Sequence, residues 1–527
     1  MNLSKKRGFF HGAAALAIGG VIVKLCGAGY KIPLGAVLGP VGMANFSIAY
    51  NIYSLLFVIA TAGVPTAVSK MVAEELSIGR KAYASRIFEV SGRFFFFFGI
   101  CGFAVMFFGA PLLSQLMGSD DATAAIRAIS PAVIFVSVSA VSRGYFQGHS
   151  DMYPTAVSEV AEAVGKLAVG LSVALILKAN GASLAVVTAG AVSGVSVGAL
   201  VSALYFEVRK RKLEKEKKLS VRKREILKKL LSLSVPITIG AAVVSLTAVI
   251  DGALVLNILK NSGFSEYRAK WLFGGYTYAS TLFGLPSFFV ATIASALVPM
   301  LAAEISRRRV AEADKLVNSA MRITVVISSV AAFGLAAVAD GVLGILYGSG
   351  ADGECLALSA KLLRCLCIGI VPLSVVTVTN AVHQTLGHPN IPVISIVCGG
   401  VLKIISNYIL VSIPEINIHG AAISTVLCYL LTAIINISGV KKYSYIGIEL
   451  KKVIIKPLTV GIAVYYSASF ALLKTKIYLA PHFSTLFAVF VGALVAIIGT
   501  FLLKNVKRND AFLVFGNTNI FKFIDND

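Results

Sequence analysis

Charged residues are scarce in this sequence. Only 14% of its 527 residues are Asp, Glu, Lys or Arg, whereas 57% are apolar. A soluble protein of this length carries roughly a quarter charged residues. The apolar surplus is too large for one buried core and must face lipid, so the composition excludes an ordinary soluble protein and indicates an integral membrane protein.

Acidic residues are few compared with basic ones, 25 against 48, which gives a net charge of +23. The basic residues lie in loops between apolar runs, and no segment is long enough to hold a nucleic-acid-binding fold, so we expect no nucleic acid partner. They gather on the loops of the N-terminal side, which predicts a multi-pass protein of the plasma (inner) membrane with both termini in the cytoplasm.

Several chemical motifs are missing. The seven cysteines form no CxxC and no Cys/His cluster with zinc spacing, so we expect neither a metal nor another cofactor. The absence of a GxxxxGK[ST] loop argues against an ATP-driven pump. No HExxH or GxSxG motif is present either, so we expect a transporter rather than an enzyme.

Long apolar runs dominate what is present. They are continuously apolar and lack a period of two, so they predict transmembrane helices rather than barrel strands, and an all-α membrane protein with about fourteen spans. The predicted spans are 10–38, 43–69, 94–113, 128–147, 154–177, 184–206, 231–258, 272–303, 323–346, 362–386, 391–412, 420–439, 457–473 and 483–503.

One basic stretch divides the chain. Residues 207–230 predict a cytoplasmic linker that rests on the anionic lipids of the inner leaflet. The domains expected around it are an N-lobe with spans 1–6, a C-lobe with spans 7–12, a final pair of spans and a cytoplasmic tail, at residues 1–206, 231–439, 440–503 and 504–527.

The two groups of six helices repeat one another. Gln147 and Gln384 are 237 residues apart, and so are Lys166 and Lys403. Six helices in each unit give both units the same direction across the membrane. The repeat therefore predicts two lobes related by a pseudo-twofold axis along the membrane normal, with a central cavity between them.

Charged side chains inside the predicted spans are the candidate functional residues, because charge in a bilayer is costly and faces an interior or a water-filled path. Lys24 and Lys31 are seven residues apart, two turns on one helix face, among several glycines. Glu159, Glu162 and Lys166 share a face at spacings of three and four, with Lys403 at the equivalent place in the second half.

Structural alternatives remain open for these residues. Glu162 and Lys166 can form an internal ion pair that only ties helices together. Arg143 lies near the cytoplasmic end of its span, where it either reaches the interface or joins the substrate site. Asp251 is a candidate for binding a cation or for coupling.

The segment Arg143 to Gly148, followed by Asp151, Pro154 and Glu159, resembles the stage V sporulation protein B group of polysaccharide transporters. Residues 38–42 and 62–65 agree, and the resemblance covers essentially the whole chain. The stage V sporulation protein B group belongs to the oligosaccharide flippases, in the superfamily that also holds multidrug extruders and lipid II flippases. The resemblance implies alternating access and a lipid-linked saccharide as cargo.

Lipid II flippases use basic residues of helix one for the pyrophosphate of their cargo, which implies this role for Lys24 and Lys31. The resemblance also implies a portal between helices one and eight, lined here by Phe283, Gly284 and Pro286. We therefore expect a flippase that moves a polyprenyl-pyrophosphate-linked saccharide, an oligosaccharide or peptidoglycan precursor, from the inner to the outer leaflet. It would serve cell-wall, spore-cortex or polysaccharide synthesis, with cell-wall synthesis enzymes as partners.

Two other functions remain open. A multidrug or cation antiporter of the same superfamily would use an acidic cation site and an apolar pocket, whereas the charges in these spans are mostly basic. A membrane glycosyltransferase or polymerase would need acidic pairs in sizeable outer loops, and the outer loops here are short.

Overall fold

The computed structural model describes residues 3–211, 223–443, 447–449 and 451–502, and these are helices and short connections without a strand. The chain divides into two compact units, Met1–Gly274 and Gly275–Asp527. The first unit holds α1 Leu3–Thr61, α2 Val64–Ser77, α3 Lys81–Phe108, α4 Ala110–Leu116, the 3-10 turn η1 Asp120–Ala122, α5 Thr123–Ile129, α6 Ala132–Gly148, α7 Tyr153–Ala179, α8 Leu184–Arg211, α9 Lys223–Asn261 and the start of α10 Glu266–Gly284.

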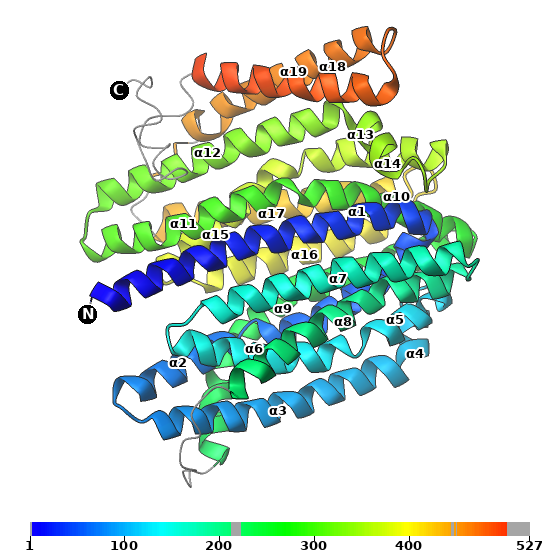
Figure 1. Ribbon diagram of the computed structural model, residues 1–527. Coiled ribbons are helices and arrows are strands. Elements are labelled where there is room, and N and C mark those ends of the chain that lie inside the picture. Colours follow the sequence, from blue (N-terminus) through cyan, green and yellow to red (C-terminus); the bar gives the residue numbers. More distant parts are fainter. Residues whose placement is uncertain (1–2, 212–222, 444–446, 450, 503–527) are drawn as a thin grey trace. The chain divides into compact units, whose positions relative to one another are not determined.

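The second unit contains the rest of α10 and the helices that follow it (Figure 1). These are α11 Pro286–Ser306, α12 Val310–Ala337, α13 Ala339–Tyr347, α14 Gly353–Cys367, α15 Ile370–Thr385, α16 Asn390–Val411, α17 His419–Tyr443, the π-helical turn η2 Lys451–Ile455, α18 Lys456–Thr475 and α19 Pro481–Leu502. The predicted lobe boundary lies earlier in the chain, because α9 is part of the first unit.

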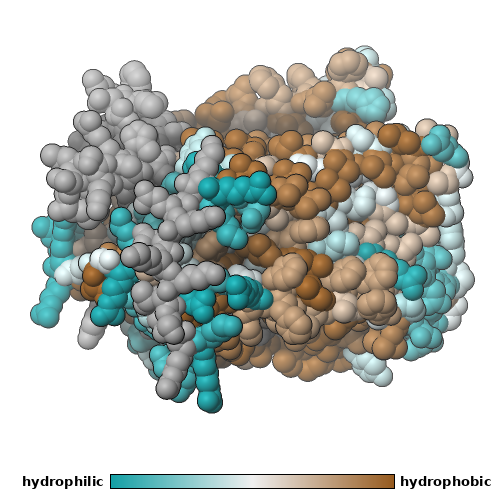
Figure 2. Space-filling view, turned by 60° about the horizontal axis from the view of Figure 1, so that its bottom comes forward, coloured by the Kyte–Doolittle hydropathy of each residue, from teal (hydrophilic) through white to brown (hydrophobic). Residues whose placement is uncertain are grey.

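The described residues contain 11 helices that are long and apolar enough to cross a membrane, or 12 if the bent pair α14 and α15 is one span. The stretch Ile18–Ser77 has 60 residues, and at about 1.5 Å per residue it exceeds a ~30 Å hydrocarbon core severalfold. With this stretch crossing twice and α9 as a further span, the helices are roughly consistent with the predicted fourteen. Figure 2 shows apolar side chains over much of the visible face, with hydrophilic ones gathered toward its ends.

A break at Gly39 divides α1 into two arms. Gly39 has φ 66°, in the left-handed region that glycine adopts without steric cost, and Pro40 after it has no amide hydrogen to continue the helix. The Lys178 ammonium of α7 donates a hydrogen bond to the carbonyl of Val37, just before the break. The first arm is the dark-blue helix that runs from the N-terminus in Figure 1. The break falls between the first two predicted spans.

Other breaks interrupt spans that the sequence predicted as continuous. The span 43–69 is broken between Thr61 and Val64, and the span 94–113 at Gly109. The first of these breaks has a packing reason. A Cβ on Gly63 would lie 2.2 Å from the carbonyl oxygen of Ser234, so α9 approaches the chain too closely for any side chain there. Breaks also divide the spans 272–303, 323–346 and 362–386.

Glycines let α7 and α8 pack backbone to backbone. A Cβ on Gly194 would lie 2.4 Å from the Cα of Gly170, and a Cβ on Gly198 would lie 2.4 Å from the carbonyl oxygen of Glu162. Small residues at a helix interface allow this close approach inside membranes. The contact fixes where α7 lies along α8, and therefore where the charged residues of α7 lie.

The predicted linker is helical at both ends, because α8 continues to Arg211 and α9 begins at Lys223; residues 212–222 lie outside the described part, as does the predicted tail 504–527. The Lys229 ammonium donates to Glu74 Oε2 at 2.7 Å and ties α9 to α2. This hydrogen bond raises the pKa of Lys229. Ile226 and Leu230 are buried in the same contact.

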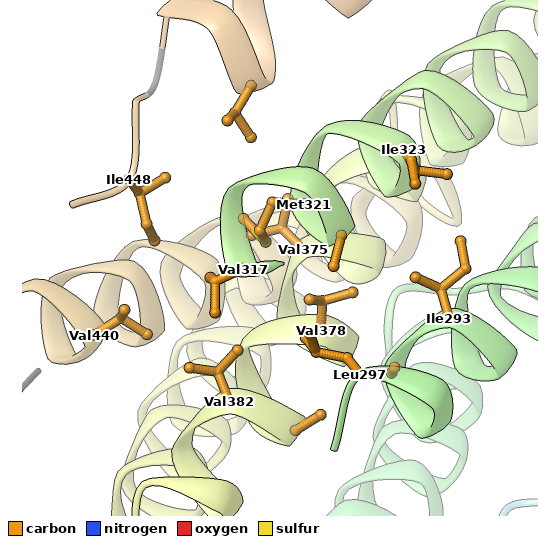
Figure 3. Close-up of a cluster of buried hydrophobic side chains, with 14 of the residues drawn as sticks. Ile293, Leu297, Val317, Met321, Ile323, Val375, Val378, Val382, Val440 and Ile448 are labelled. Atoms are coloured by element: carbon orange, nitrogen blue, oxygen red, sulfur yellow. The ribbon is translucent and has the colours of Figure 1, made fainter. Parts of the chain in front are cut away.

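An apolar core holds α11, α12, α15 and α17 of the second unit together (Figure 3). Val375, Val378 and Val382 of α15 point into it, toward residues of α11 and α12 such as Leu297 and Met321. The last two helices, α18 and α19, pack on each other and on α12. Gly461 of α18 permits this, since a Cβ there would lie 3.0 Å from the carbonyl oxygen of Ser329.

Candidate cationic site in the first unit

Tyr30 anchors the first arm of α1 to α7 and α8. Its ring lies where a Cβ on Gly170 would be, 2.8 Å from the ring edge, so glycine at 170 makes room for it. Its hydroxyl donates to the carbonyl oxygen of Ala191 at 2.7 Å. Phe46 of the second arm meets the Tyr30 ring edge-on, with the centroids 5.9 Å apart. Both arms of α1 are thus held beside α7.

Two predicted lysines meet at one aromatic ring. The Lys31 ammonium lies 5.0 Å from the centroid of Tyr50, and the Lys166 ammonium lies 5.6 Å from the same centroid and 5.4 Å from that of Tyr30. Aromatic faces attract cations, by about 0.5–2 kcal/mol depending on desolvation. Neither lysine forms an ion pair with an acidic residue that the structure describes. Their positive charges are therefore held in place by rings rather than neutralised.

Arg143 forms the ion pair with Glu162 that the sequence spacing also allowed for Lys166. Its guanidinium lies 2.8 Å from Glu162 Oε2 and 3.9 Å from Glu159 Oε1. It also donates to the hydroxyls of Ser158 and Ser202, each at 3.4 Å. Arg143 is only 7% exposed, so it lies inside the unit rather than at the interface. The alternative pairing of Glu162 with Lys166 is wrong.

The other candidate residues lie elsewhere in the two units. Lys24 is half-buried on the first arm of α1, two turns before Lys31. Asp251 is buried on α9, next to Gly252, where a Cβ would lie 3.4 Å from Asn51 of α1. Lys403 is half-buried on α16 of the second unit. That Lys166 and Lys403 flank one cavity stays a prediction.

The residues of the predicted portal fall at the break between α10 and α11. Phe283 is buried, with its ring centroid 6.0 Å from that of Tyr429. Pro286 begins α11, and a Cβ on Gly284 would meet nothing within 4 Å. The portal between the first predicted span and the eighth, residues 272–303, stays a prediction.

The geometry of the first unit suits an anionic group. Lys31 and Lys166 leave two positive charges uncompensated on a helix bundle, while Arg143 is satisfied by two carboxylates. A phosphate or pyrophosphate accepts hydrogen bonds from several ammonium groups at once. Among the described residues no group of three or more His, Cys, Asp or Glu side chains is arranged to hold a metal ion.

Sequence reasoning missed the aromatic part of the site. Tyr50 lies on the second arm of α1, and the turn at Gly39 brings it back to Lys31, so no helical spacing connects the two residues. Tyr30 directly precedes Lys31, and its burial depends on Gly170 of another helix. The repeated Tyr and Phe at the start of the second arm were the available signal, and only a tertiary structure gives it meaning.

A second buried cation was also missed. Lys270 of α10 is 3% exposed and lies 2.6 Å from Glu266 Oε1 and 2.7 Å from Asp121 Oδ2. Nearby, Asn257 of α9 donates to the carbonyl of Leu116 at 2.9 Å. These contacts fasten the connection after α4 to α9 and α10. The spacing of four from Glu266 to Lys270 was the sequence signal for the first of them.

The helices and the breaks between them define the class of this protein. It is a multi-pass membrane protein with the fold of solved transporters of the multidrug/oligosaccharidyl-lipid/polysaccharide exporter superfamily. A profile described as polysaccharide biosynthesis protein matches residues 9–305, and one described as MatE matches residues 265–409. The chain belongs to the polysaccharide biosynthesis protein family.

Curated relatives from Bacillus subtilis (strain 168) match most of the chain. The membrane protein YabM is 27% identical over 470 residues, which cover 88% of this chain and 85% of YabM. Stage V sporulation protein B is 26% identical over 455 residues, covering 85% and 86%. Lipid II flippase MurJ is 25% identical over 456 residues, covering 82% and 83%. The relatives with an assigned activity are transporters, which confirms that the chain is not an enzyme.

Solved structures share the fold. Lipid II flippase MurJ in an inward closed conformation matches with a TM-score of 0.70 and 16% identity, covering 94% of this chain and 98% of that chain. An inward-facing multidrug resistance MATE family transporter matches with a TM-score of 0.67 and 17% identity, covering 80% and 94%. These comparisons confirm the predicted all-α membrane fold and the resemblance to the stage V sporulation protein B group.

Proposed function

We propose that this protein is a flippase that moves a polyprenyl-pyrophosphate-linked saccharide from the inner to the outer leaflet by alternating access. The observation that carries the proposal is the pair of lysines at Tyr50, whose positive charges have no acidic partner among the described residues. An anionic cargo would supply that partner. Lys24 on the same arm of α1 and Lys403 on α16 are proposed as further contacts.

The physical problem that such a protein solves is desolvation of the headgroup. A charged, hydroxyl-rich headgroup cannot enter hydrocarbon without losing its water, whereas the prenyl tail can remain in lipid. The protein therefore offers hydrogen-bonding and cationic groups to the headgroup while the tail stays outside. In this proposal, Arg143 holds the local geometry through its ion pairs with Glu159 and Glu162, and the two glutamates offer carboxylate oxygens to saccharide hydroxyls.

The cargo of the named relatives supports this choice of substrate. The relative MurJ is a lipid II flippase by name, and the matching family is named for polysaccharide biosynthesis. We propose a peptidoglycan precursor or another lipid-linked oligosaccharide, used in cell-wall, spore-cortex or polysaccharide synthesis, with cell-wall synthesis enzymes as partners. Asp251, buried on α9, is the proposed residue for cation binding or coupling. If net charge moves, the membrane potential contributes about 2.3 kcal/mol per charge per 100 mV.

A multidrug transporter is the competing function, because the MatE profile covers residues 265–409 and multidrug transporters share the fold. The two functions require opposite charge in the pocket, since cationic drugs need an acidic site. The uncompensated lysines of the first unit favour the anionic cargo.

Reconstitution tests the proposal directly. The full chain is placed in liposomes with fluorescent lipid II, and the fraction of lipid that an externally added quencher or enzyme reaches is followed over time. We expect translocation by the wild-type protein and its loss in Lys31→Ala and Lys166→Ala, with the exposed Lys315→Ala as the matched control. Transport of a cationic dye without any movement of the lipid would overturn the proposal in favour of the multidrug function.

Orientation is a separate part of the proposal. The loops on the N-terminal side carry most of the basic residues, which supports an orientation with both termini in the cytoplasm of a plasma (inner) membrane protein. A C-terminal fusion to green fluorescent protein should fluoresce, whereas the same fusion to alkaline phosphatase should be inactive. An active phosphatase fusion would reverse the orientation and with it the direction of transport.

A further inference from the structure

Helix α15 presents two different faces. Val375, Val378 and Val382 point into the core with α11 and α12 (Figure 3). The opposite side of the helix carries Thr377, Asn380 and Gln384, at spacings of three and four, and these three residues are half-buried or exposed. Polar side chains on a membrane-crossing helix are found toward protein or water rather than lipid. This side of α15 therefore offers uncharged hydrogen-bonding groups.

Asn380 is held in a fixed orientation by a buried residue of α17. Asn436 is 0% exposed and donates from its Nδ2 to Asn380 Oδ1 at 2.7 Å and to Thr379 Oγ1 at 3.1 Å. The amide nitrogen of Asn380 has no hydrogen-bond partner among the described residues. Asn436 thus fixes the acceptor end of Asn380 and leaves its donor end available.

The packing around Asn436 leaves buried polar atoms that lower the stability of the fold. His383 is 0% exposed, and its Nε2 lies 2.9 Å from the carbonyl oxygen of Asn436. Its ring fits only because residue 439 is glycine, where a Cβ would lie 3.0 Å from the His383 Cε1. His383 Nδ1 and Asn436 Oδ1 are buried without partners, and such groups destabilise a fold by about 1–3 kcal/mol each. An apolar pair would pack here at lower cost, so the polar residues point to a function.

The predicted internal repeat indicates which function. The interval of 237 residues that relates Lys166 to Lys403 also relates Arg143 to Asn380. The two acids around Arg143 have no counterparts, because the positions that match Glu159 and Glu162 are Ile396 and Gly399. The side chains at these positions are therefore charged in the first half, whereas in the second half only Lys403 carries a charge. A lipid-linked saccharide has the same division between its charged pyrophosphate and its uncharged hydroxyls.

We infer that Asn380 binds the saccharide part of the cargo, and that Asn436 is the residue that positions it. The Asn380 amide nitrogen donates to a saccharide oxygen. This inference rests on the proposed function and deepens it, because it names the residue that recognises the saccharide.

Two lipid probes separate this inference from the proposed function. Binding of undecaprenyl pyrophosphate, which has no saccharide, and of lipid II is measured by native mass spectrometry on the full chain. We expect Asn380→Ala to bind undecaprenyl pyrophosphate like the wild type and lipid II about tenfold more weakly, the effect of one hydrogen bond. Asn380→Asp has the same shape and can still accept from Asn436 but lacks the donor, so it should show the same selective loss.

The positioning role needs its own variant and control. Asn436→Ala should weaken lipid II binding severalfold without changing the binding of undecaprenyl pyrophosphate, a selectivity that loss of folding would not produce. Thr385→Ala, on the same helix, hydrogen-bonds only within α15 and should change neither probe. Wild-type protein that binds neither lipid overturns the proposed function. The inference alone is overturned if the wild type binds both lipids equally, or if Asn380→Asp weakens both alike or neither.

Discussion

The Arg143 guanidinium lies 2.8 Å from Glu162 Oε2, one helical turn from Lys166 on the same face of α7. Arg143 comes from α6 and is buried, so it reaches this carboxylate in a fixed geometry that a flexible lysine does not match. Lys166 instead lies against the rings of Tyr30 and Tyr50. One ion pair therefore decides which cation of the first unit remains available for a ligand.

Replacing Lys166 should impair binding without unfolding the protein. In Lys166→Ala we expect affinity for undecaprenyl pyrophosphate to fall by tenfold or more, since hydrogen bonds to charged groups contribute about 1.5–3 kcal/mol. Native mass spectrometry measures the affinity, and Lys166→Arg should retain part of it. A thermal unfolding temperature equal to that of the wild type shows that the loss is specific; unchanged affinity would remove Lys166 from the site.

Removing the acidic partner of Arg143 should mainly affect stability. Glu162→Gln leaves a buried guanidinium with a neutral neighbour, and we expect a loss of about 2–3 kcal/mol in the free energy of unfolding. Glu159→Gln should cost much less, because that carboxylate is 3.9 Å away and its side chain is 34% exposed. Denaturant unfolding in detergent compares the two variants. Equal losses would mean that the two carboxylates share Arg143 evenly.

The backbone contact between α7 and α8 can be tested through one methyl group. In Gly194→Ala the new Cβ would lie 2.4 Å from the Gly170 Cα and 2.7 Å from the Lys166 carbonyl oxygen, so α7 must shift. We expect a loss of roughly 1–3 kcal/mol in stability together with weaker lipid binding. Gly92→Ala is the control, because nothing lies within 4 Å of its Cβ position and alanine favours the helix.

The ion pair of Lys270 with Asp121 is suited to a charge exchange. Each single variant, Asp121→Lys or Lys270→Asp, should lower the unfolding temperature by placing like charges together. The double variant should recover part of the loss, which gives a coupling energy of about 0.5–3 kcal/mol. Additive losses would show that the 2.7 Å contact contributes nothing to the fold.

The sequence predicted the class of fold because hydrocarbon imposes a single requirement on every span. Runs of about twenty apolar residues must be helical, and α7, α8 and α16 begin and end close to the predicted bounds. The breaks at Gly63, Gly109 and Leu285 were not predicted. They depend on how closely another helix approaches and on where a proline ends the hydrogen-bonding pattern, and hydropathy reports neither.

The candidate site was predicted in part for the same reason. Lys31, Arg143, Glu162 and Lys166 were identified because charge inside an apolar run stands out, and the structure brings these residues together on α1, α6 and α7. The pairing was not predictable, since Glu162 has a basic residue in reach both on its own helix and on another. Asn380 and Asn436 carry no charge, so composition gave no signal for them.

The turn at Gly39 places Lys31 and Tyr50 on separate arms of α1, so the 5.0 Å contact between the ammonium and the ring centroid depends on the angle between those arms as well as on the lysine rotamer. A ligand that draws the ammonium away from the ring must change either the lysine rotamer or that angle. A spectroscopic label on each arm would distinguish the two, because only a change in the angle at Gly39 would alter the distance between the labels.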